Sequence, residues 1–569
     1  MLNPLLQYEA AEQKIAAGET SLALCIDAVL ALARGGATDL ALSRFHELGL
    51  ASATLSEDAQ ALLGRLLKDQ AMALSGAART AKLLESGEAY QRAFDLTGGY
   101  YSGINAATLY TLAGQSDRGL ELAQRTGALL SDQPHADRGE ERYYQAATLA
   151  EIHLLKGDLQ SACRQLSAAI EEDPENINAR ATTLRQFLRI LEFRDQSSDW
   201  LEPLRPPALC FFAGSMPSAS RTADGRSGLA QDIRNVIKSS KIGEAYGALA
   251  AGRDIEFSEI ALEEGVRLHL VLPVPLDAFR EHSVAAFGAC WEPRFTKCLE
   301  AASSVQVATQ DQSLLGHMAI QYAAEIAMGT VIRLADTRMS QAVQVLVDPK
   351  PGSMTEALGD AWSHAGKHPS LVLRAAEKAE RSTHRQDDEG GRVLSAMLFA
   401  DLFRFSQLDH AQTLATVKHV LGPLAEVLDT YSDRLHHLNS WGDGIFAAFH
   451  SASDAADAAL EMQTRLGGLD LESVGLPKSM SLRIGAHYGP VSCSPDPVTR
   501  RNTLYGSHVA QAAKIEPLAV PGSILASESF AAALALSGRT DISASYVGKF
   551  QLSAVEHAVR LFALGKQAA

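Results

Sequence analysis

Hydrophobic residues in the first 200 positions recur every three or four residues, which is the spacing of an amphipathic helix. The segment "AATLAEIHLLKGDLQSACRQLSAAI" shows this spacing twice, on either side of a short turn at 156–158. An earlier copy turns at 113–115, and the later pair ends near the proline at 174. The pattern predicts an all-α region of helix pairs over residues 1–200.

The spacing changes near Pro206. Short apolar runs typical of buried strands, "ALCFFAGS", "RLHLVLP" and "AVQVLVD", alternate with helical segments such as "LAQDIRNVIKSS" and "AIQYAAEIAMGTVIRLA". Strands that alternate with helices predict a parallel sheet covered by helices. We therefore expect a Rossmann-like α/β domain over residues 206–350.

A connector is expected over residues 351–390. Pro349, Pro351 and Gly352 interrupt regular structure, and the following "LRAAEKAERSTHRQDDEGG" is highly charged and helical in pattern. Such a charge run is either a solvated helix face or a short signalling helix that joins two domains.

The last region, residues 391–569, places two carboxylates where strands end. The strand "VLSAMLFA" leads to Asp401, and the bend between the strands "RLHHLN" and "IFAAF" contains Asp443. In adjacent antiparallel strands these positions converge, and Mg²⁺ favours carboxylate oxygens with phosphate and water in its remaining positions. Two other interpretations stay open, because Asp443 fits a simple hairpin turn and Asp401 fits a helix cap.

Composition narrows the class of protein. A length of 569 residues implies about three or four domains. The net charge of −16 argues against a nucleic-acid or anionic-membrane partner. The six cysteines form no CxxC pair, which favours reduced thiols. Neither a signal-peptide pattern nor an apolar run of about 18 residues is present, so we expect a cytoplasmic protein without a membrane span.

Two resemblances refine the first two regions. The helix pairs resemble tetratricopeptide repeats, which implies a concave surface for a protein or peptide partner, unless the array packs only against its own chain. "FFAGS" and "AAGRDIEFSEIALEEGVRLHLVLP" resemble nucleotide-sensor relatives of the lysine-decarboxylase-like fold. That resemblance implies a nucleotide-derived ligand at Gly214, Ser215, Gly252 and Asp254, with a structural spacer as the alternative.

The C-terminal region resembles class III nucleotidyl cyclases. "FADLFRFSQL", "NSWGDGIFAAF", "LRIGAHYGPV" and "LYGSHVAQAAKIEPLAVPGSILAS" stand in the order and spacing of the adenylyl and guanylyl cyclase catalytic domain. The resemblance implies a ferredoxin-like α+β fold that works as a head-to-tail homodimer. The implied reaction converts a nucleoside triphosphate into a 3′,5′-cyclic nucleotide and pyrophosphate with two Mg²⁺ or Mn²⁺ ions.

The resemblance also implies a role for each matched residue. Asp401 and Asp443 match the two metal-binding aspartates. Leu402 and Phe403 lie in the backbone segment that wraps the triphosphate. Asn439 and Thr503 match the two base-reading positions, where Thr503 favours ATP over GTP.

Two positions depart from the family pattern. Ala510 replaces an asparagine that orients the ribose, and Lys514 replaces an arginine that neutralises the α-phosphate. Lysine keeps the charge but lacks the planar fork of arginine. Two hypotheses follow: a signalling cyclase, with activity reduced by these changes, in which Lys514 contacts phosphate; or a catalytically impaired nucleotide-binding scaffold.

Overall fold

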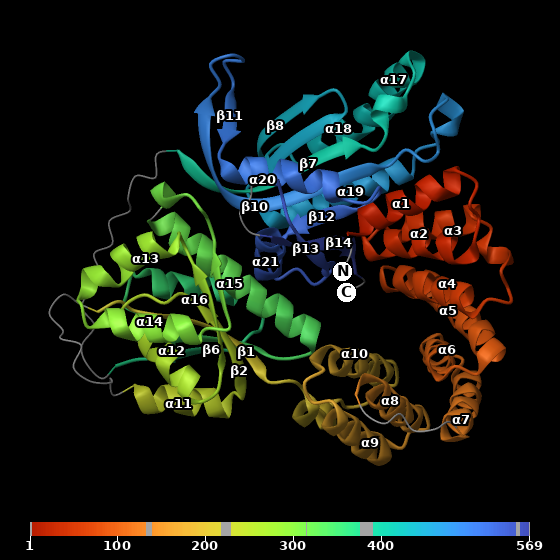
Figure 1. Cartoon of the computed structure of the whole chain (residues 1–569), viewed down its shortest axis with the longest axis horizontal. Coiled ribbons are helices and arrows are strands. Elements are labelled where there is room, and N and C mark those ends of the chain that lie inside the picture. The colour runs from red at the N-terminus through yellow and green to blue at the C-terminus, as the bar shows by residue number, and fades with distance from the viewer. Residues whose placement is uncertain are drawn as a thin grey trace.

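The structure is a computed structural model that describes residues 3–132, 139–217, 229–314, 316–375, 391–553 and 558–567. Figure 1 shows a helical region, an α/β unit and a C-terminal unit built on a second sheet. The helical region curves from the C-terminal unit at one end to the α/β unit at the other (Figure 1). No helix within the described ranges is long and apolar enough to cross a membrane. All six cysteines are free thiols.

The helical region confirms the predicted helix pairs. Its turns fall at the expected places, because α6 ends at Leu112, α8 ends at Leu155 and α9 ends at Glu172. The α-helices described in this region are α1 (Pro4–Ala16), α2 (Leu22–Arg34), α3 (Thr38–Glu47), α4 (Glu57–Met72), α5 (Gly76–Thr97), α6 (Tyr100–Leu112), α7 (Ser116–Asp132), α8 (Glu140–Leu155), α9 (Leu159–Glu172) and α10 (Ile177–Phe193).

The α/β unit contains a parallel sheet in the order β4-β3-β2-β1-β5-β6. Its strands are β1 (Ala208–Gly214), β2 (Ile242–Gly247), β3 (Arg267–Leu272), β4 (Ser304–Val307), β5 (Ala342–Val347) and β6 (Ser370–Leu373). Its helices are α11 (Ala230–Ser239), α12 (Arg253–Glu263), α13 (Leu276–Ser283), α14 (Trp291–Ala301), α15 (His317–Arg338) and α16 (Met354–His364). The order of strands reverses between β1 and β5.

The sheet extends further along the chain than the pattern suggested. β6 pairs with β5, so α16 and β6 belong to the α/β unit although the sequence placed them in the connector 351–390. β6 alternates between exposed and half-buried residues because it lies at the sheet edge, which weakens its hydrophobic signal. The charged helix expected over 376–390 lies outside the described residues.

The C-terminal unit has a mixed sheet in the order β13-β14-β12-β10-β7-β9-β8, and β11 pairs with β10. Its strands are β7 (Arg392–Leu402), β8 (Leu435–Trp441), β9 (Gly444–Phe449), β10 (Leu482–Pro495), β11 (Asn502–Tyr505), β12 (Ile524–Ser527), β13 (Ile542–Phe550) and β14 (Val559–Lys566). Its helices are α17 (His410–Thr416), α18 (Gly422–Asp429), α19 (Ala452–Gly467), α20 (Ser507–Ile515) and α21 (Glu528–Leu536). One core joins α18, α19 and α21 to the sheet, and a smaller core joins α20 to it.

Close backbone contacts hold the three parts together. A Cβ at Gly329 of α15 would lie 1.9 Å from the Ala532 carbonyl oxygen of α21, so only glycine permits this helix crossing. At the other end of the chain, a Cβ at Gly35 would lie 2.4 Å from the Val520 side chain. The C-terminal unit is therefore packed against both the α/β unit and the first helices.

A buried histidine pair adds polar contacts to the first of these interfaces. His487 of β10 lies 2.8 Å from His508 of α20 and 2.8 Å from the Ser527 hydroxyl. His508 also lies 3.3 Å from the hydroxyl of Thr309, which follows β4 in the α/β unit. Burial lowers the pKa of His508 to about 4 and lowers that of His487. Both rings are therefore neutral at pH 7, and they fix the start of α20.

The histidine pair predicts how stability depends on pH. An unfolded histidine has a pKa near 6.5. Below that pH the unfolded chain therefore binds a proton at this residue, whereas folded His508 stays neutral. Above pH 6.5, neither the folded nor the unfolded state protonates this histidine, and the free energy of unfolding is unaffected by it. As the pH falls from 6.5 toward 4, only the unfolded state is protonated, so the free energy of unfolding decreases by about 1.4 kcal/mol for each pH unit. Urea unfolding between pH 7.5 and 5 should show a smaller loss in His508→Phe than in the unaltered chain.

The exposed histidine His410 supplies the control, because His410→Phe should keep the full pH dependence. An unchanged slope in His508→Phe would show that the buried ring does not titrate as described.

Candidate active site

Asp401 and Asp443 come from neighbouring strands of the C-terminal sheet. Asp401 is the penultimate residue of β7, and Asp443 lies in the two-residue loop between the paired Trp441 and Gly444. Gly442 opens this loop at φ 65°, a conformation that suits glycine. β7 and β9 run antiparallel with Ala400 opposite Ile445, so the end of one strand meets the hairpin tip. The structure thus brings the two carboxylates together.

Asp401 changes the acidity of Asp443. The pKa of Asp443 rises to about 6, because the group is partly buried and because Asp401 both shares a hydrogen bond with it and repels its charge. The backbone N–H of Leu402 donates to the Asp443 carboxylate and partly offsets this rise. Such a pair of close carboxylates favours a positive charge, either a proton or a cation, between them.

Arg483 and Glu516 extend this cluster and were not found from the sequence. Arg483 of β10 lies opposite Asp401 in the strand register, and its guanidinium forms ion pairs of 2.9 Å with Asp401 and 3.0 Å with Glu516. Burial raises the pKa of Glu516 to about 7, with Arg483 acting against the rise and the two aspartates adding to it. Arg483 therefore fixes one side of the Asp401 carboxylate. A single arginine in an apolar strand gave no signal of this role.

The donor set fits a divalent cation that shares its shell with a ligand. Among the described residues, no group of three or more histidine, cysteine or acidic side chains could hold a metal by itself. Mg²⁺ commonly takes one or two protein carboxylates and completes its shell with phosphate oxygens and water. Asp401 and Asp443 supply that number of carboxylates, with the excess negative charge described above.

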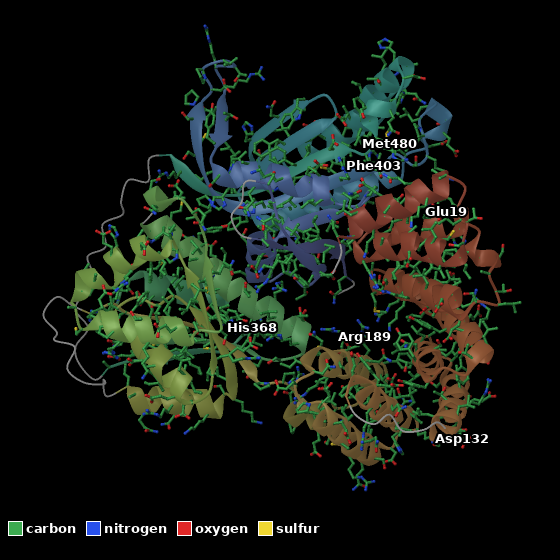
Figure 2. All side chains as sticks on the ribbon, viewed as in Figure 1. Glu19, Asp132, Arg189, His368, Phe403 and Met480 are labelled. Carbon is green, nitrogen blue, oxygen red and sulfur yellow. The ribbon has the colours of Figure 1, made fainter. Side chains whose placement is uncertain are left out.

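A backbone segment that wraps a triphosphate needs free amide groups, but two amides after Asp401 are already bonded within the chain. The Leu402 amide donates to Asp443, and the Phe403 amide donates to the Ser481 carbonyl at 2.9 Å. Arg404 has a left-handed backbone, and its guanidinium lies 5.0 Å from the centre of the Phe403 ring. The positive charge of Arg404 acts on Tyr8 of α1, where it lowers the pKa of the phenol against the rise caused by burial. The first helix therefore lies beside this segment (Figure 2). Both amides are therefore already used within the chain.

The two predicted base-reading residues lie on touching strands. Asn439 is exposed on β8, and its side-chain oxygen accepts a hydrogen bond of 2.9 Å from the Ser440 amide. Thr503 is on β11, opposite Ser494 of β10. A hydrogen bond between His437 and the backbone of Asn502 joins β8 to β11. The fold thus places Asn439 and Thr503 on the same side of one chain.

The two departures from the family pattern lie on one face of α20. Ala510 is exposed, and Lys514 follows one helical turn later and is half-buried. Within the described ranges, Lys514 forms no ion pair with a carboxylate, so a single chain does not join it to Asp401 and Asp443.

Large apolar side chains remain exposed around these elements. They are 42–87% exposed and come from α17 and the turn that follows it, β8, the hairpin tip and the β10–β11 arm: Leu414, Val417, Leu438, Trp441, Val498 and Tyr505. In Figure 1, α17, β8 and β11 lie along the edge of the C-terminal unit that faces away from the α/β unit. We call these six residues the outer apolar surface.

The residues predicted for a ligand in the α/β unit also come together. Asp254 accepts hydrogen bonds from the Gly214 amide at 2.7 Å and the Ala250 amide at 3.2 Å, and burial raises its pKa to about 7. A Cβ at Gly252 would lie 2.8 Å from the Ser215 carbonyl oxygen. Both Asp254 oxygens are thus occupied by the backbone, so this side chain ties the ends of β1 and β2 together.

Comparison with known proteins follows the same division of the chain. Residues 5–110 match the family described as Tetratricopeptide Repeats-Sensor. Residues 393–565 match the Adenylate and Guanylate cyclase catalytic domain. A curated protein of Rhizobium meliloti (strain 1021), described as "Putative adenylate cyclase 3", is 29% identical over 180 residues. These residues make up 30% of this chain and span only 28% of that relative's length.

Solved structures of cyclases match about a third of the chain. Adenylate cyclases from Trypanosoma brucei in their monomeric state match at 20% identity and a TM-score of 0.28, over 32% of this chain and 93% of theirs. The adenylyl cyclase CyaB from P. aeruginosa matches at 17% identity and a TM-score of 0.27, over 31% of this chain and 96% of its own. The family matches, together with the motif order, establish that this chain carries a tetratricopeptide-repeat sensor domain at its N-terminus and a class III adenylate/guanylate cyclase catalytic domain over residues 393–565.

Proposed function

We propose that the protein is a nucleotidyl cyclase that converts a nucleoside triphosphate into a 3′,5′-cyclic nucleotide and pyrophosphate. The observation that carries the proposal is the meeting of Asp401 and Asp443, where burial and the contact with Asp401 together raise the pKa of Asp443. In the reaction, the ribose 3′-oxygen bonds to the α-phosphorus, its proton is lost, and the bond to the pyrophosphate oxygen breaks.

Each residue of the site has a task in this proposal. Asp401 and Asp443 would hold two divalent cations, which supply Lewis acidity toward the triphosphate when bound. Arg483 keeps the Asp401 carboxylate in place through the 2.9 Å ion pair. Lys514 provides a positive charge for the α-phosphate. Lysine carries a single point charge, whereas the arginine of the family can bind two phosphate oxygens at once. We therefore expect slow turnover.

A second copy of the chain completes the site in this proposal. Within the described ranges, Lys514 has no ion pair with the aspartates of its own chain. The outer apolar surface leaves six large side chains exposed on and next to α17, β8 and the β10–β11 arm. A head-to-tail dimer would cover that surface. It would also bring Lys514, Asn439 and Thr503 of one copy to the aspartates of the other. The Asn439 and Thr503 side chains can donate and accept hydrogen bonds with either purine. We favour ATP because adenylyl cyclases carry aspartate or threonine at the position of Thr503.

The upstream parts would control this output. The strand reversal between β1 and β5 supports a Rossmann-like α/β unit that binds a nucleotide derivative beyond these strands. Gly214, Ser215, Gly252 and Asp254 would shape that pocket through the backbone bonds described above. The tetratricopeptide-like helices would serve a protein or peptide partner in the same pathway.

The direct test is product formation by the full-length chain. Incubation with ATP, GTP, CTP and UTP in the presence of Mn²⁺ should give a cyclic nucleotide, mainly from ATP, that mass spectrometry identifies. Asp443→Asn removes a charge that holds the cation and should lower the rate by at least about 10²-fold. Asp433→Asn changes an exposed aspartate ten residues earlier and should leave the rate unchanged.

The same assay separates the alternative function. A chain that binds ATP and Mn²⁺ without forming any cyclic product would be a nucleotide-binding scaffold, the alternative that Ala510 and Lys514 motivate. Equal product from Asp443→Asn and the unaltered chain would contradict both functions at this site.

The two departures predict a gain of activity when they are reversed. Ala510→Asn combined with Lys514→Arg restores a ribose hydrogen bond and a two-pronged phosphate contact, which should raise kcat by about 10²-fold. The control pairs Lys514→Arg with Ala512→Ser, which changes a buried residue on the opposite face of α20. A double variant no faster than the unaltered chain would show that neither position contacts the nucleotide.

Mixing inactive variants tests the dimer. Asp443→Asn and Lys514→Ala are each expected to be inactive alone, but a mixed dimer contains one site with both native residues. An equal mixture should therefore recover about a quarter of the native activity, since half of the dimers are mixed and each has one complete site.

The matched control mixes Asp443→Asn with Asp401→Asn. Both changes affect the same half of the site, so no mixed dimer is complete and no activity should return. Failure of the first mixture, with each variant folded, would argue against a site shared between two copies.

A further inference from the structure

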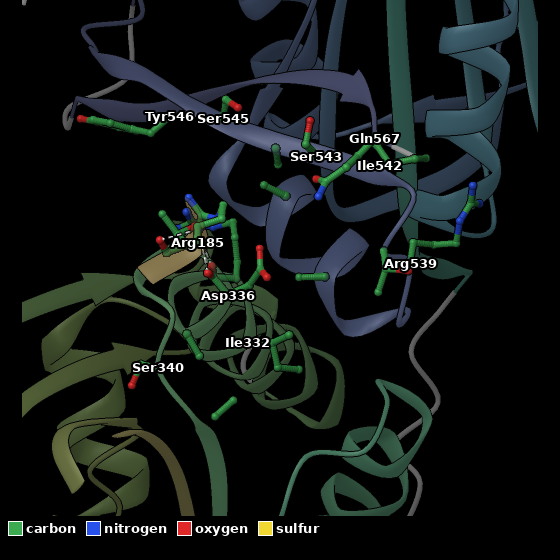
Figure 3. A pocket seen from close by; sticks show the side chains of 18 of the residues that line it. Arg185, Ile332, Asp336, Ser340, Arg539, Ile542, Ser543, Ser545, Tyr546 and Gln567 are labelled. Atoms are coloured by element: carbon green, nitrogen blue, oxygen red, sulfur yellow. Dashed lines mark hydrogen bonds between the residues drawn. The ribbon is translucent and has the colours of Figure 1, made fainter. Parts of the chain in front are cut away.

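A large basic cavity lies where the three parts of the chain meet. Its volume is about 1650 Å³, above the roughly 300–1,000 Å³ of most small-molecule pockets. Its walls come from the first helices and α4, α5 and α10, from α15 and the loop that follows α16, and from α21, β13 and β14. Figure 3 shows Arg185 of α10 beside Asp336 of α15, with Ser543 and Ser545 of β13 across the cavity. The site is separate from Asp401 and Asp443, which do not line it.

The charge of this cavity is opposite to that of the whole chain. Its described lining contains eight arginines and three lysines against four carboxylates, although the chain carries a net charge of −16. A concave wall that gathers one sign of charge focuses the electrostatic potential inside it. In a strongly acidic protein, such a concentration of cations indicates an anionic ligand.

Several of these cations lack an acidic partner. Within the described ranges, Arg79, Arg189 and Arg333 form no ion pair with any carboxylate. The Nε atom of Arg333 is buried and has no hydrogen-bond partner, and its guanidinium lies 4.2 Å from the centre of the Phe562 ring. Because Nε is covered by the chain itself, a ligand oxygen could reach only the terminal nitrogens of the Arg333 guanidinium.

The arginines on the helical wall also repel one another. Burial lowers the pKa of Arg189, and the charges of Arg185 and Arg79 lower it further, while Glu192 and Asp69 act in the opposite direction. The Nη2 group of Arg185 donates hydrogen bonds to the carbonyl oxygens of Asp336 and Thr337. These bonds tie α10 to the end of α15. Arg79 and Arg189 thus line the cavity from the helical region, and Arg333 and Lys367 line it from the α/β unit.

We propose that this cavity binds a multiply phosphorylated small molecule that bridges the helical region and the α15 wall. Guanidinium groups match phosphate oxygens in geometry and charge, and cations from two parts of the chain favour a ligand with several anionic groups. Tyr546 is the one aromatic residue besides His368 among the described lining residues, so charge rather than base stacking provides recognition. The concave side of the helical array is thus directed at a small anion held against the chain's own α/β and cyclase units.

The test uses the full-length chain and inorganic tripolyphosphate in EDTA, without divalent cations. Calorimetry should detect binding that weakens as salt rises. Arg189→Gln and Arg333→Gln should each weaken it about tenfold, because each removes a charge-assisted contact. The Tm of Arg189→Gln without ligand should stay close to that of the native chain, which shows that the variant is folded. Arg164→Gln on the exposed side of α9 should bind as the native chain does.

Three further measurements decide the outcome. Lys514→Ala should leave tripolyphosphate binding unchanged, so a failure of the cyclase proposal and a failure of this one are distinguishable. ATP and guanosine tetraphosphate, compared with tripolyphosphate, show whether the source is nucleotide or inorganic. The absence of binding, equal binding by Arg189→Gln and Arg333→Gln, or equally tight binding of a polyglutamate peptide would overturn the proposal.

Discussion

The contact between Asp401 and Asp443 is the constraint on which the candidate site depends. Two carboxylates that share a hydrogen bond and repel each other are unfavourable in a folded protein unless a cation or a proton compensates them. The strand register of β7 and β9 forces this proximity. Arg483 and Glu516 then form a second layer, because the guanidinium takes up part of the negative charge without separating the aspartates.

The surrounding architecture positions the same site from a distance. Gly329 lets α15 lie directly on α21, and the His487–His508 pair connects the next strand to the start of α20. Thr309 of the α/β unit reaches His508, and α1 lies beside the segment that follows Asp401. Both upstream parts therefore touch an element of the candidate site. Under the proposed function, these contacts would give a regulator two physical routes to the cyclase unit.

Much of this organisation follows from the sequence, for identifiable reasons. The helix pairs, the parallel strands and the meeting of Asp401 with Asp443 follow from periodicity and from turn residues such as Gly442. Edge strand β6 was not predicted, because it has only four residues and none of them is fully buried.

Other features depend on contacts between residues far apart in the chain. Arg483 and Glu516 meet Asp401 only through the sheet, and the amides of Leu402 and Phe403 are committed to Asp443 and Ser481. Asp254 was expected beside a ligand, but its oxygens bind backbone amides. The basic cavity has lining residues in all three parts of the chain, so no local pattern could have revealed it.

The central claim is that the two aspartates jointly hold a divalent cation against a triphosphate. A crystal structure of the full-length chain with Mn²⁺ and a non-hydrolysable ATP analogue tests this most directly, through the anomalous signal of manganese. We expect manganese bound to carboxylate oxygens of both Asp401 and Asp443 and to phosphate oxygens of the analogue. Manganese bound elsewhere, or an analogue held away from both aspartates, would contradict it.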